Sequence, residues 1–540
     1  MTFIRHRDLC PSGEGPDMTT EIGRTSATQP DWRRRLFILG TAGAGALAMS
    51  GLPGRVLAAT TERLKVALHA NPSSLDPATG SSGSDHMYLY CLYDTLTEWD
   101  PDTLTVRPGL ARSHAFTDPK TLVLDLEEGV TFHDGTPLDA EAVKFNLDRV
   151  RSEPISNIRA DLATVESVEV TGPLQVTLHL KESDSALPLI LSDRVGMVLS
   201  PTALRASEGG RIDRAPVGSG PWKLVSWTDG ERFLAERHPG YWRDDRPGMQ
   251  EIEILIMPDA ATRLRSLQSG QTHIACQITE LLQPIVKRSP TLEVRARPTI
   301  WCYTLFLNAS KGPLADVRVR QALNHAIDRE NFIRAAMAGQ GEAASMMLPK
   351  SHWAYATEAE GRTTFDLDKA KALLAEAGYA DGFTLDFRGF PDQAYVQRQE
   401  VILNQLSKVG IRGRFANAPI PETDSRWWGE RQGEAYFSVW TGRPDPTNIY
   451  TILYGETSYY NPSRLKPPEG FMEAIAESRA TDDQAARAKA LSKAQVLAMD
   501  FALNVPIAFR YQMDAVNRSV SDFGPNLLGK PKFTTAVVGS

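Results

Sequence analysis

Two hydrophobic periodicities occur along this sequence, and together they exclude an all-helical and an all-strand fold. Apolar residues alternate with polar ones over TLVLDL (121–126), LQVTLHL (174–180) and EIEILIM (251–257), a period of two that predicts half-buried strands. Apolar residues also recur at helical spacing after Asp139 and again over 319–327, which predicts two helices. Because strands and helices do not alternate strictly, we expect an α/β fold of the mixed α and β type.

The length of the chain requires more than one hydrophobic core. Single cores stop growing near about 250–300 residues, whereas this chain has 540. No internal repeat or low-complexity segment is visible, which excludes solenoids and propellers. Its 42% hydrophobic and 23% charged residues are typical of a soluble globular protein, and its net charge of −7 disfavours nucleic-acid binding, which uses basic surfaces. The sequence therefore predicts a soluble protein of two or more lobes.

An export signal is predicted near the N-terminus. Segment 36–52 is uncharged and rich in Gly and Ala, and it is shorter than the ~20 apolar residues of a membrane-spanning helix. RRLFI (34–38) resembles the twin-arginine export signal, and small residues that suit a signal peptidase follow at 56–58. We predict export to the periplasm and a mature form without a membrane anchor; an anchored helix is the alternative. The start is left open between Met1 and Met18, since a signal that began at Met1 would have an unusually long N-terminal region.

The cysteines permit at most one disulfide in the mature chain. Cys10 lies in the N-terminal extension, which leaves Cys91, Cys276 and Cys302. An odd number cannot pair completely. Cys276 and Cys302 are candidates for one disulfide in an oxidising compartment, and buried free thiols are the alternative that we favour.

Several long segments carry a resemblance to a known family. They occur in a fixed order between residue 64 and about residue 520. The segments are LKVALHANPSSLDPATG (64–80), the stretch 93–150 with FHDGTPLDAEAVKFNLDRV at its end, PVGSGPWKLVSW (216–227), HPGYWR (238–243) and TLFLNASKGPLADVRVRQALNHAIDRENFI (304–333). In this order and spacing, the chain resembles the extracytoplasmic solute-binding proteins of the peptide and nickel ABC-transporter group, solute-binding family 5.

The resemblance implies a two-lobed periplasmic-binding-protein clamshell, with an extra subdomain in the first lobe and two crossover strands near 303–308 and 505–509. The implied divisions are the N-terminal extension and signal (1–59), lobe 1 (60–300) with the inserted subdomain (about 78–213), lobe 2 (301–505) and a return segment to lobe 1 (506–540). Closure of the hinge over a guest that contacts both lobes would be the binding event. The implied partners are a small-molecule or short-peptide ligand and the permease subunits of an ABC importer, and the protein is expected to be a monomer without cofactor.

Enzymatic and metal-binding motifs are not visible. His133 and Asp134 belong to FHDG, which favours a turn in which the histidine satisfies local hydrogen bonds, and no partner ligands for a metal are apparent. GSGPWK (218–223) lacks the spacing of a phosphate-binding loop and is typical of a tight turn between strands. No HExxH, GxSxG or paired CxxC occurs, so an exported hydrolase, the hypothesis from another functional class, has no nucleophile and base to support it.

SVWTGRPDPTNIY (438–450) is the segment that the resemblance places in the cleft of the second lobe. Peptide-binding members often read W-x-G-D-x-x-D-P there, and the first Asp meets the α-ammonium of the peptide. Here Arg443 occupies that acidic position and Asp445 follows two residues later. Three interpretations remain open: Asp445 takes the ammonium role, Arg443 binds a carboxylate or phosphate of the guest, or Arg443 pairs with Asp445 and braces the loop.

The resemblance suggests further residues of the cleft. The candidate ligand-binding residues are Ser82, Gly83, Ser84, Trp301, Tyr303, Trp427, Trp428, Trp440, Arg443 and Asp445. Small residues over 81–84 allow close main-chain contact with a guest, and one of the adjacent tryptophans at 427–428 is expected to pack inward and the other to be exposed. Asp424, Glu430 and Glu434 are either ammonium anchors or, as we favour, a solvated charged loop.

The expected guest is a peptide or a peptide-like solute, because a large cleft suits extended ligands held partly by main-chain hydrogen bonds. The alternative keeps the binding role but changes the guest to an anionic non-peptide solute, such as an opine, a sugar conjugate or a metal chelate, bound by Arg443.

Overall fold

The computed structural model describes residues 62–539. The predicted export signal, its cleavage point, the candidate start residues Met1 and Met18, and Cys10 lie outside the described residues. Among residues 62–539, no helix combines the length and the apolar character needed to cross a bilayer.

One large mixed sheet organises the described chain. Its strands follow the order β15-β14-β16-β12-β17-β11-β1-β10-β9-β8, and β13 pairs with β17 at the side. The bounds are β1 Arg63–Leu68, β8 Trp222–Thr228, β9 Arg232–Arg237, β10 Glu251–Ile256, β11 Ile274–Ala275, β12 Leu292–Leu307, β13 Gly341–Ala343, β14 Phe383–Gly389, β15 Ile411–Asn417, β16 Ala435–Trp440 and β17 Asn504–Asn517. Parallel pairs (β1 with β10, β14 with β15) occur beside antiparallel ones, which confirms the mixed α and β fold.

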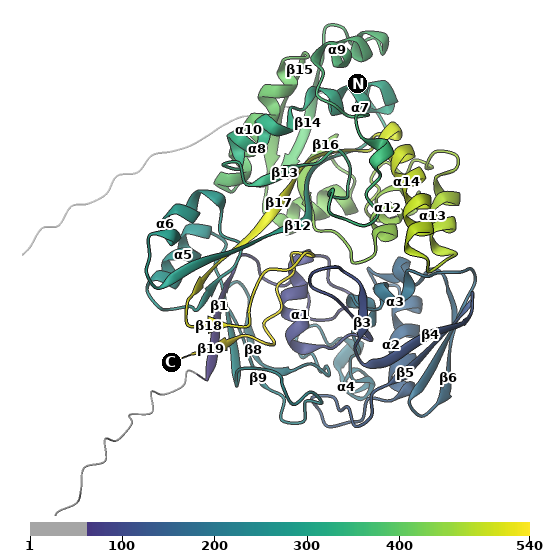
Figure 1. Ribbon diagram of the computed structural model, residues 1–540, viewed down its shortest axis with the longest axis vertical. Helices are drawn as coiled ribbons and strands as arrows, with labels where there is room; N and C mark the ends of the chain where they lie inside the picture. Colours follow the sequence, from purple (N-terminus) through teal and green to yellow (C-terminus); the bar gives the residue numbers. More distant parts are fainter. Residues whose placement is uncertain (1–61, 540) are drawn as a thin grey trace, which may run out of the picture. The chain divides into compact units, whose positions relative to one another are not determined.

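The long strands β12 and β17 connect the two halves of this sheet (Figure 1). Residues 292–298 of β12 pair with 511–517 of β17, whereas 302–306 pair with 504–509, and the register is irregular between Pro298 and Cys302. A proline lacks the N–H that a ladder needs, so this interruption follows from the sequence. We call β1 and β8–β11, with the elements packed on them, the first lobe, and β13–β16, with theirs, the second lobe.

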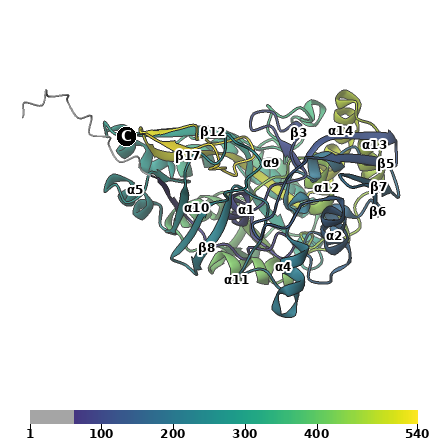
Figure 2. The ribbon, with the colours of Figure 1, turned by 90° about the horizontal axis from the view of Figure 1, so that it is seen from below.

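The first lobe carries a smaller antiparallel sheet, which lies between β1 and β8 in the sequence. Its order is β4-β5-β7-β6, and Figure 2 shows β5, β6 and β7 close together. The bounds are β4 Ala111–Asp118, β5 Thr121–Leu126, β6 Val165–Gly172 and β7 Gln175–Leu180. The strands predicted over 121–126 and 174–180 are β5 and β7, and Leu122, Leu124 and Leu126 are buried as their alternation predicts.

Helices cover both sheets, and helix α2 begins at the capping residue that the sequence predicts. Asp139 Oδ1 accepts a hydrogen bond from the Ala142 N–H at 2.9 Å, which caps the predicted helix α2. The α-helices are α1 His86–Leu92, α2 Ala140–Ser152, α3 Leu187–Ile190, α4 Pro201–Ala206, α5 Ala260–Gln268, α6 Gln283–Lys287, α7 Val317–Ala326, α8 Arg329–Ala336, α9 Leu367–Glu376, α10 Gln393–Ser407, α11 Ile420–Asp424, α12 Pro446–Tyr454, α13 Phe471–Arg479 and α14 Gln484–Phe501. Short strands complete the list: β2 Thr97–Trp99, β3 Val106–Pro108, β18 Val520–Ser521 and β19 Val537–Val538.

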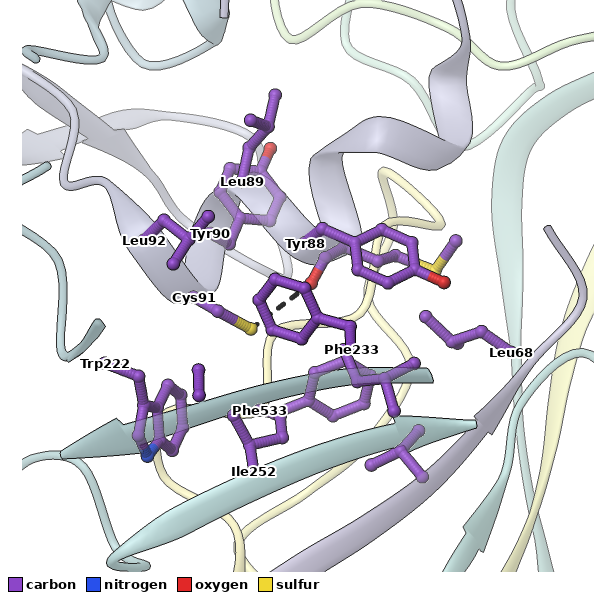
Figure 3. Close-up of a cluster of buried hydrophobic side chains, with 14 of the residues drawn as sticks. Leu68, Tyr88, Leu89, Tyr90, Cys91, Leu92, Trp222, Phe233, Ile252 and Phe533 are labelled. Atoms are coloured by element: carbon purple, nitrogen blue, oxygen red, sulfur yellow. Dashed lines mark hydrogen bonds between the residues drawn. The ribbon is translucent and has the colours of Figure 1, made fainter. Parts of the chain in front are cut away.

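Helix α1 is buried along its whole length and anchors the core of the first lobe. Figure 3 shows Tyr88 and Cys91 of this helix facing Trp222, Phe233 and Ile252 of the neighbouring strands. The Tyr88 and Phe233 rings meet edge to face at 5.3 Å between centroids. Because α1 begins at His86, this core fixes the position of the loop 81–85 that precedes it.

The cysteines of the described chain are buried free thiols, Cys91, Cys276 and Cys302. The candidate disulfide between Cys276 and Cys302 is therefore not formed, and the favoured alternative is the one observed. Burial raises the pKa of the Cys302 thiol to about 12, so this group is neutral and behaves as a small apolar side chain.

The predicted turn over 218–223 packs tightly against the end of α1. A Cβ atom at Gly218 would lie 2.0 Å from the Leu92 carbonyl oxygen, so only glycine fits there. His133 holds the same turn: its Nδ1 accepts from the Gly218 N–H at 3.2 Å, and its Nε2 lies 3.0 Å from the Gly220 carbonyl oxygen. The local hydrogen-bonding role predicted for His133 is confirmed.

Candidate functional site

The segment 441–445 links β16 to α12 and presents Arg443. Gly442 adopts a φ of +71°, and a Cβ atom there would lie 2.3 Å from Ile300 Cδ1. Both the left-handed backbone and this close approach require glycine, which explains the Gly of the Trp440-x-Gly442 pattern. The turn places Arg443 outside the strand, beside the crossover region that holds Ile300.

Asp445 is committed to the protein. Its Oδ1 accepts from the Thr447 N–H at 2.9 Å and from the Thr447 hydroxyl at 2.6 Å, which caps α12, and its Oδ2 accepts from Arg487 Nη2 at 2.7 Å. Burial alone would raise the pKa of this carboxyl, but Arg487 and Thr447 outweigh it and hold the pKa below the ordinary value. The residue is 1% exposed, both of its carboxylate oxygens accept hydrogen bonds from the protein, and no ion pair joins it to Arg443.

Arg443 has no such partner. Its guanidinium lies over the Trp440 ring at 5.2 Å and over the Tyr460 ring at 6.0 Å, and its Nη1 donates to the Gly442 carbonyl oxygen at 2.9 Å. The side chain is half-buried, and no carboxylate of residues 62–539 lies within ion-pair distance of it. Stacking on two rings orients the guanidinium while its charge remains unneutralised.

The small residues predicted in the first lobe lie against this loop. Ser82 caps a short 3-10 helix over Gly83–Asp85, and its Oγ accepts from the Ser84 N–H at 3.2 Å. A Cβ atom at Gly83 would lie 3.1 Å from the Thr441 side chain, so the two loops touch. The structure therefore brings the loop of Ser82, Gly83 and Ser84 into contact with the loop that carries Arg443.

A charged cluster of the first lobe lies behind these small residues. Lys530 Nζ lies 3.1 Å from His86 Nε2 and 3.4 Å from Asp193 Oδ2, and His86 also pairs with Asp193. Burial would raise the pKa of the Asp193 carboxyl, but His86 and Lys530 hold it well below the ordinary value. Burial lowers the pKa of the Lys530 ammonium to about 8, and Arg443 acts in the same direction.

The adjacent tryptophans are both buried, so the expectation that one is exposed is wrong. Trp427 is 0% and Trp428 6% exposed, because one wide helical turn over Ser425–Gly429 directs both into the same aromatic cluster. Trp427 lies 5.5 Å from the Tyr436 ring, and Trp428 lies 5.1 Å from the Phe306 ring. The bulk of both rings is core packing beneath Trp440.

The favoured interpretation of Asp424, Glu430 and Glu434 as a solvated charged loop holds for only part of the set. Asp424 is half-buried and accepts from the Tyr436 hydroxyl at 2.6 Å, and burial raises the pKa of its carboxyl to about 6. Glu434 accepts from the Asp386 N–H at 2.9 Å, whereas Glu430 is exposed.

Trp301 and Tyr303, on the crossover strand β12, are also buried. Trp301 donates its indole N–H to the Leu528 carbonyl oxygen at 2.5 Å, which fastens the return segment to β12. Tyr303 stacks on Phe437 at 5.8 Å and lies under the guanidinium of Arg398 at 4.8 Å. The structure places both residues at the junction of the lobes, with Tyr303 turned toward the second.

Two ion pairs close the contact between the lobes. Arg398 Nη2 of α10 lies 3.0 Å from Glu280 Oε2, and Arg479 Nη1 of α13 lies 3.4 Å from Asp184 Oδ2. The Arg479 carbonyl oxygen also accepts from the Ser185 N–H at 2.9 Å. Sequence analysis missed these residues, because no motif marks them and each pair is formed only by the tertiary fold.

Comparison with protein families gives one extensive match. The model for bacterial extracellular solute-binding proteins, family 5 middle, matches residues 105–461. Those residues contain the segment around FHDG, the 216–227 turn and the loop that carries Arg443.

Characterised relatives align along most of the chain. It is 27% identical over 509 residues to the dipeptide-binding protein of Escherichia coli (strain K12), which covers 86% of this chain and 92% of that protein. It is 30% identical over 413 residues to the glutathione-binding protein GsiB of Salmonella paratyphi A, which covers 72% of this chain and 80% of that protein.

Solved structures share the fold at lower identity. A dipeptide-binding protein from Pseudoalteromonas sp. SM9913 in complex with Met-Leu superposes with a TM-score of 0.82 and 23% identity, covering 88% of this chain and 100% of that one. The binding protein AgaA of Agrobacterium tumefaciens R10, in complex with agropinic acid, gives 0.78 and 23%, covering 87% and 98%. These are periplasmic-binding-protein structures, and the fold expected from the sequence is confirmed.

Proposed function

Since the chain belongs to the bacterial extracellular solute-binding proteins of family 5, we propose that it is the periplasmic receptor of an ABC importer for a peptide or peptide-like solute. The observation that carries the choice of guest is the alignment with a dipeptide-binding protein over 86% of this chain. Other relatives are glutathione-binding proteins, and similar solved structures hold Met-Leu and the peptide STSA. A peptide guest is consistent with the half-buried, charged surroundings of Arg443.

In this proposal the lobes over 60–300 with 506–540, and over 301–505, close on the guest by bending at β12 and β17. The irregular pairing between Pro298 and Cys302 supplies the flexible point. Ser82, Gly83 and Ser84 approach the guest from one side, and Trp440 and Arg443 from the other. The closed form, with its guest chemically unaltered, is what the permease subunits would recognise.

We also propose export by the twin-arginine route and a monomeric mature form without a membrane anchor. The support is RRLFI at 34–38, followed by a weakly hydrophobic segment. Replacing Arg34 and Arg35 together by lysine should keep the protein out of the periplasm. A periplasmic level equal to that of the unmodified protein would refute this route.

A second candidate guest is an anionic non-peptide solute. It is favoured by the unpaired guanidinium of Arg443 at the position where peptide-binding members carry an acid. One similar structure holds agropinic acid. Planar recognition of a carboxylate by two N–H groups is the interaction to which this side chain is suited.

Thermal denaturation with added ligands tests both candidates. A ligand that binds only the folded protein stabilises it by mass action, by about 2.7 kcal/mol at 100 times its Kd. We expect Met-Leu or glutathione to raise the melting temperature and agropinic acid to leave it unchanged. A shift with agropinic acid alone would replace the peptide by the anionic solute.

A further inference from the structure

Asp161 is an uncommitted carboxylate on the first-lobe side of the site. It lies in a 3-10 helix over Arg159–Leu162, and Asn157, just before this helix, ties it to the loop that leads to Ser82: the Asn157 N–H donates to the Ala78 carbonyl oxygen at 2.8 Å, and its amide donates to the Thr79 carbonyl oxygen at 2.7 Å. Asp161 is half-buried, and within residues 62–539 it makes no side-chain hydrogen bond or ion pair.

The other carboxylate near Arg443 is already occupied. The positive charge of Arg443 lowers the pKa of the Asp161 carboxyl and that of the Asp193 carboxyl. Asp193 is held by His86 and Lys530, as described above. Asp161 is therefore the one of the two whose charge remains available.

The three arginines that influence the pKa of Asp161 also differ in whether they have partners within the protein. Burial raises the pKa of the Asp161 carboxyl, and the charges of Arg443, Arg194 and Arg479 oppose this, with Arg443 foremost. Arg194 donates to the Gly80 carbonyl oxygen, and Arg479 is bonded to Asp184 and to Asn448. Arg443 alone of the three keeps its guanidinium free of any acidic partner.

Contacts between the lobes bring the segments of Asp161 and Arg443 close together, although no ion pair joins the two residues. Just after the helix that carries Asp161, Thr164 Oγ1 donates to Asp184 Oδ2 at 2.7 Å. Asp184 pairs with Arg479, and Arg479 donates to Asn448 in the first turn of α12, the helix that follows Arg443. Two desolvated and unpaired charges are unfavourable in the empty protein. A guest that carries both a cation and an anion would satisfy both charges at once and would make the two lobes hold together.

We propose that Asp161 binds the ammonium group of a zwitterionic guest while Arg443 binds its carboxylate. The acidic residue that binds the ammonium group then belongs to the first lobe, whereas peptide-binding members carry it on the second. The guest would therefore lie in the cleft with its amino and carboxyl ends exchanged relative to those members. This inference rests on the proposed peptide-binding function and assigns the residue that determines recognition of the amino group.

Isothermal titration with Met-Leu, N-acetyl-Met-Leu and Met-Leu amide tests the assignment. Loss of a charge-assisted hydrogen bond costs about 10- to 100-fold in affinity. We expect the unmodified protein to bind Met-Leu best, and Asp161→Asn to bind it about 10- to 100-fold more weakly while its affinity for N-acetyl-Met-Leu is unchanged. Arg443→Gln should lose the same factor for Met-Leu and nothing for the amide.

Asp244→Asn is the matched control, because Asp244 is an exposed aspartate of the same lobe without a bond to another described residue. It should leave all three affinities unchanged. If Asp161→Asn keeps the preference of the unmodified protein for Met-Leu over its acetylated form, the assignment of Asp161 is overturned while the peptide function stands. If the unmodified protein binds none of the three probes, the peptide function fails and the assignment fails with it. Acetylation of the probe tests the same contact without any change to the protein, so a folding defect cannot imitate the result.

Discussion

Opposite charges of the two lobes form ion pairs at Glu280 and Arg398 and at Asp184 and Arg479, whereas the charges of Asp161 and Arg443 remain unpaired. At Glu280 and Arg398 the charged atoms lie 3.0 Å apart and the side chains are 7% and 4% exposed. At Asp161 and Arg443 both side chains are half-buried, and no ion pair joins them. The charges of Glu280 and Arg398 are neutralised without a guest, whereas those of Asp161 and Arg443 would be neutralised only when a guest is bound.

This difference separates two contributions to lobe closure. A paired charge holds the lobes together in every state in which they meet, so it sets how far the empty protein closes. Two opposite charges that do not form an ion pair stabilise the closed form only when a guest bridges them. Closure in that region therefore depends on the presence of the guest. The predictions below test whether the two regions are as different as their geometry indicates.

Glu280→Gln should have the largest effect on stability. It leaves the guanidinium of Arg398 buried without its counter-charge, which costs about 4 kcal/mol in the free energy of unfolding. Urea denaturation followed by tryptophan fluorescence measures this loss. Glu182→Gln, at an exposed glutamate of the same lobe, is the control and should change stability by less than about 0.5 kcal/mol. Equal losses in the two variants would show that the pair does not hold the lobes.

Asp445→Ala should rank second. It removes both the cap of α12 and the partner of Arg487, but Arg487 is 11% exposed and can be partly hydrated, so we expect a loss of about 3 kcal/mol. Asp483→Ala removes only the cap of α14, where the Asp483 carboxylate accepts from the Ala486 N–H at 2.7 Å, and should cost about 1 kcal/mol. If Asp445→Ala costs no more than Asp483→Ala, Asp445 is not committed to Arg487 and becomes a candidate ligand residue again.

The local elements of the fold could be predicted from the sequence, but the partners of its charges could not. The alternation over 121–126 and the cap at Asp139 depend on residues a few positions apart, and both are observed. Arg443 and Asp445 are neighbours in sequence, which suggested that they pair. Asp445 instead bonds to Arg487, 42 residues away, because the start of α12 turns its carboxylate inward.

The candidate site shows the same limit. Family motifs led to Arg443 and to Ser82, Gly83 and Ser84, and the structure brings the two loops that carry them into contact. Asp161 and Lys530 belong to no motif and reach the site only through the packing of the inserted sheet and of the return segment. A single sequence carries no signal for such contacts, since they depend on how distant elements meet.

The change in stability caused by Asp445→Ala and the change caused by Asp161→Asn should depend on pH with opposite signs. The pKa of Asp445 is lowered in the folded protein, so its charge contributes stability above the unfolded pKa of about 3.9, and this contribution is lost as the pH falls through the folded pKa. Burial raises the pKa of Asp161, so its carboxyl favours folding below the unfolded pKa, and that contribution is lost as the pH rises through the folded pKa. Asp161→Asn should therefore stabilise the empty protein at pH 7, by about 0.5 kcal/mol, and this gain should vanish below about pH 4. Denaturation at pH 7 and pH 4 measures both variants, and a loss of stability at pH 7 in Asp161→Asn would mean that the carboxylate has a partner in the empty protein.

Arg443→Gln should change stability as little as Asp161→Asn does, although it removes a full charge. The guanidinium makes no ion pair with residues 62–539. The variant therefore loses only the stacking of the guanidinium on Trp440 and Tyr460, which contributes about 0.5 kcal/mol at a partly exposed site. Arg487→Gln is the matched control: the same chemical change at a paired arginine should cost about 3 kcal/mol, because it leaves Asp445 buried and uncompensated. Urea denaturation of the two variants, without added ligand, gives both values. Equal losses would mean that Arg443 is held by the protein as firmly as Arg487, and then no charge would be kept free for a guest.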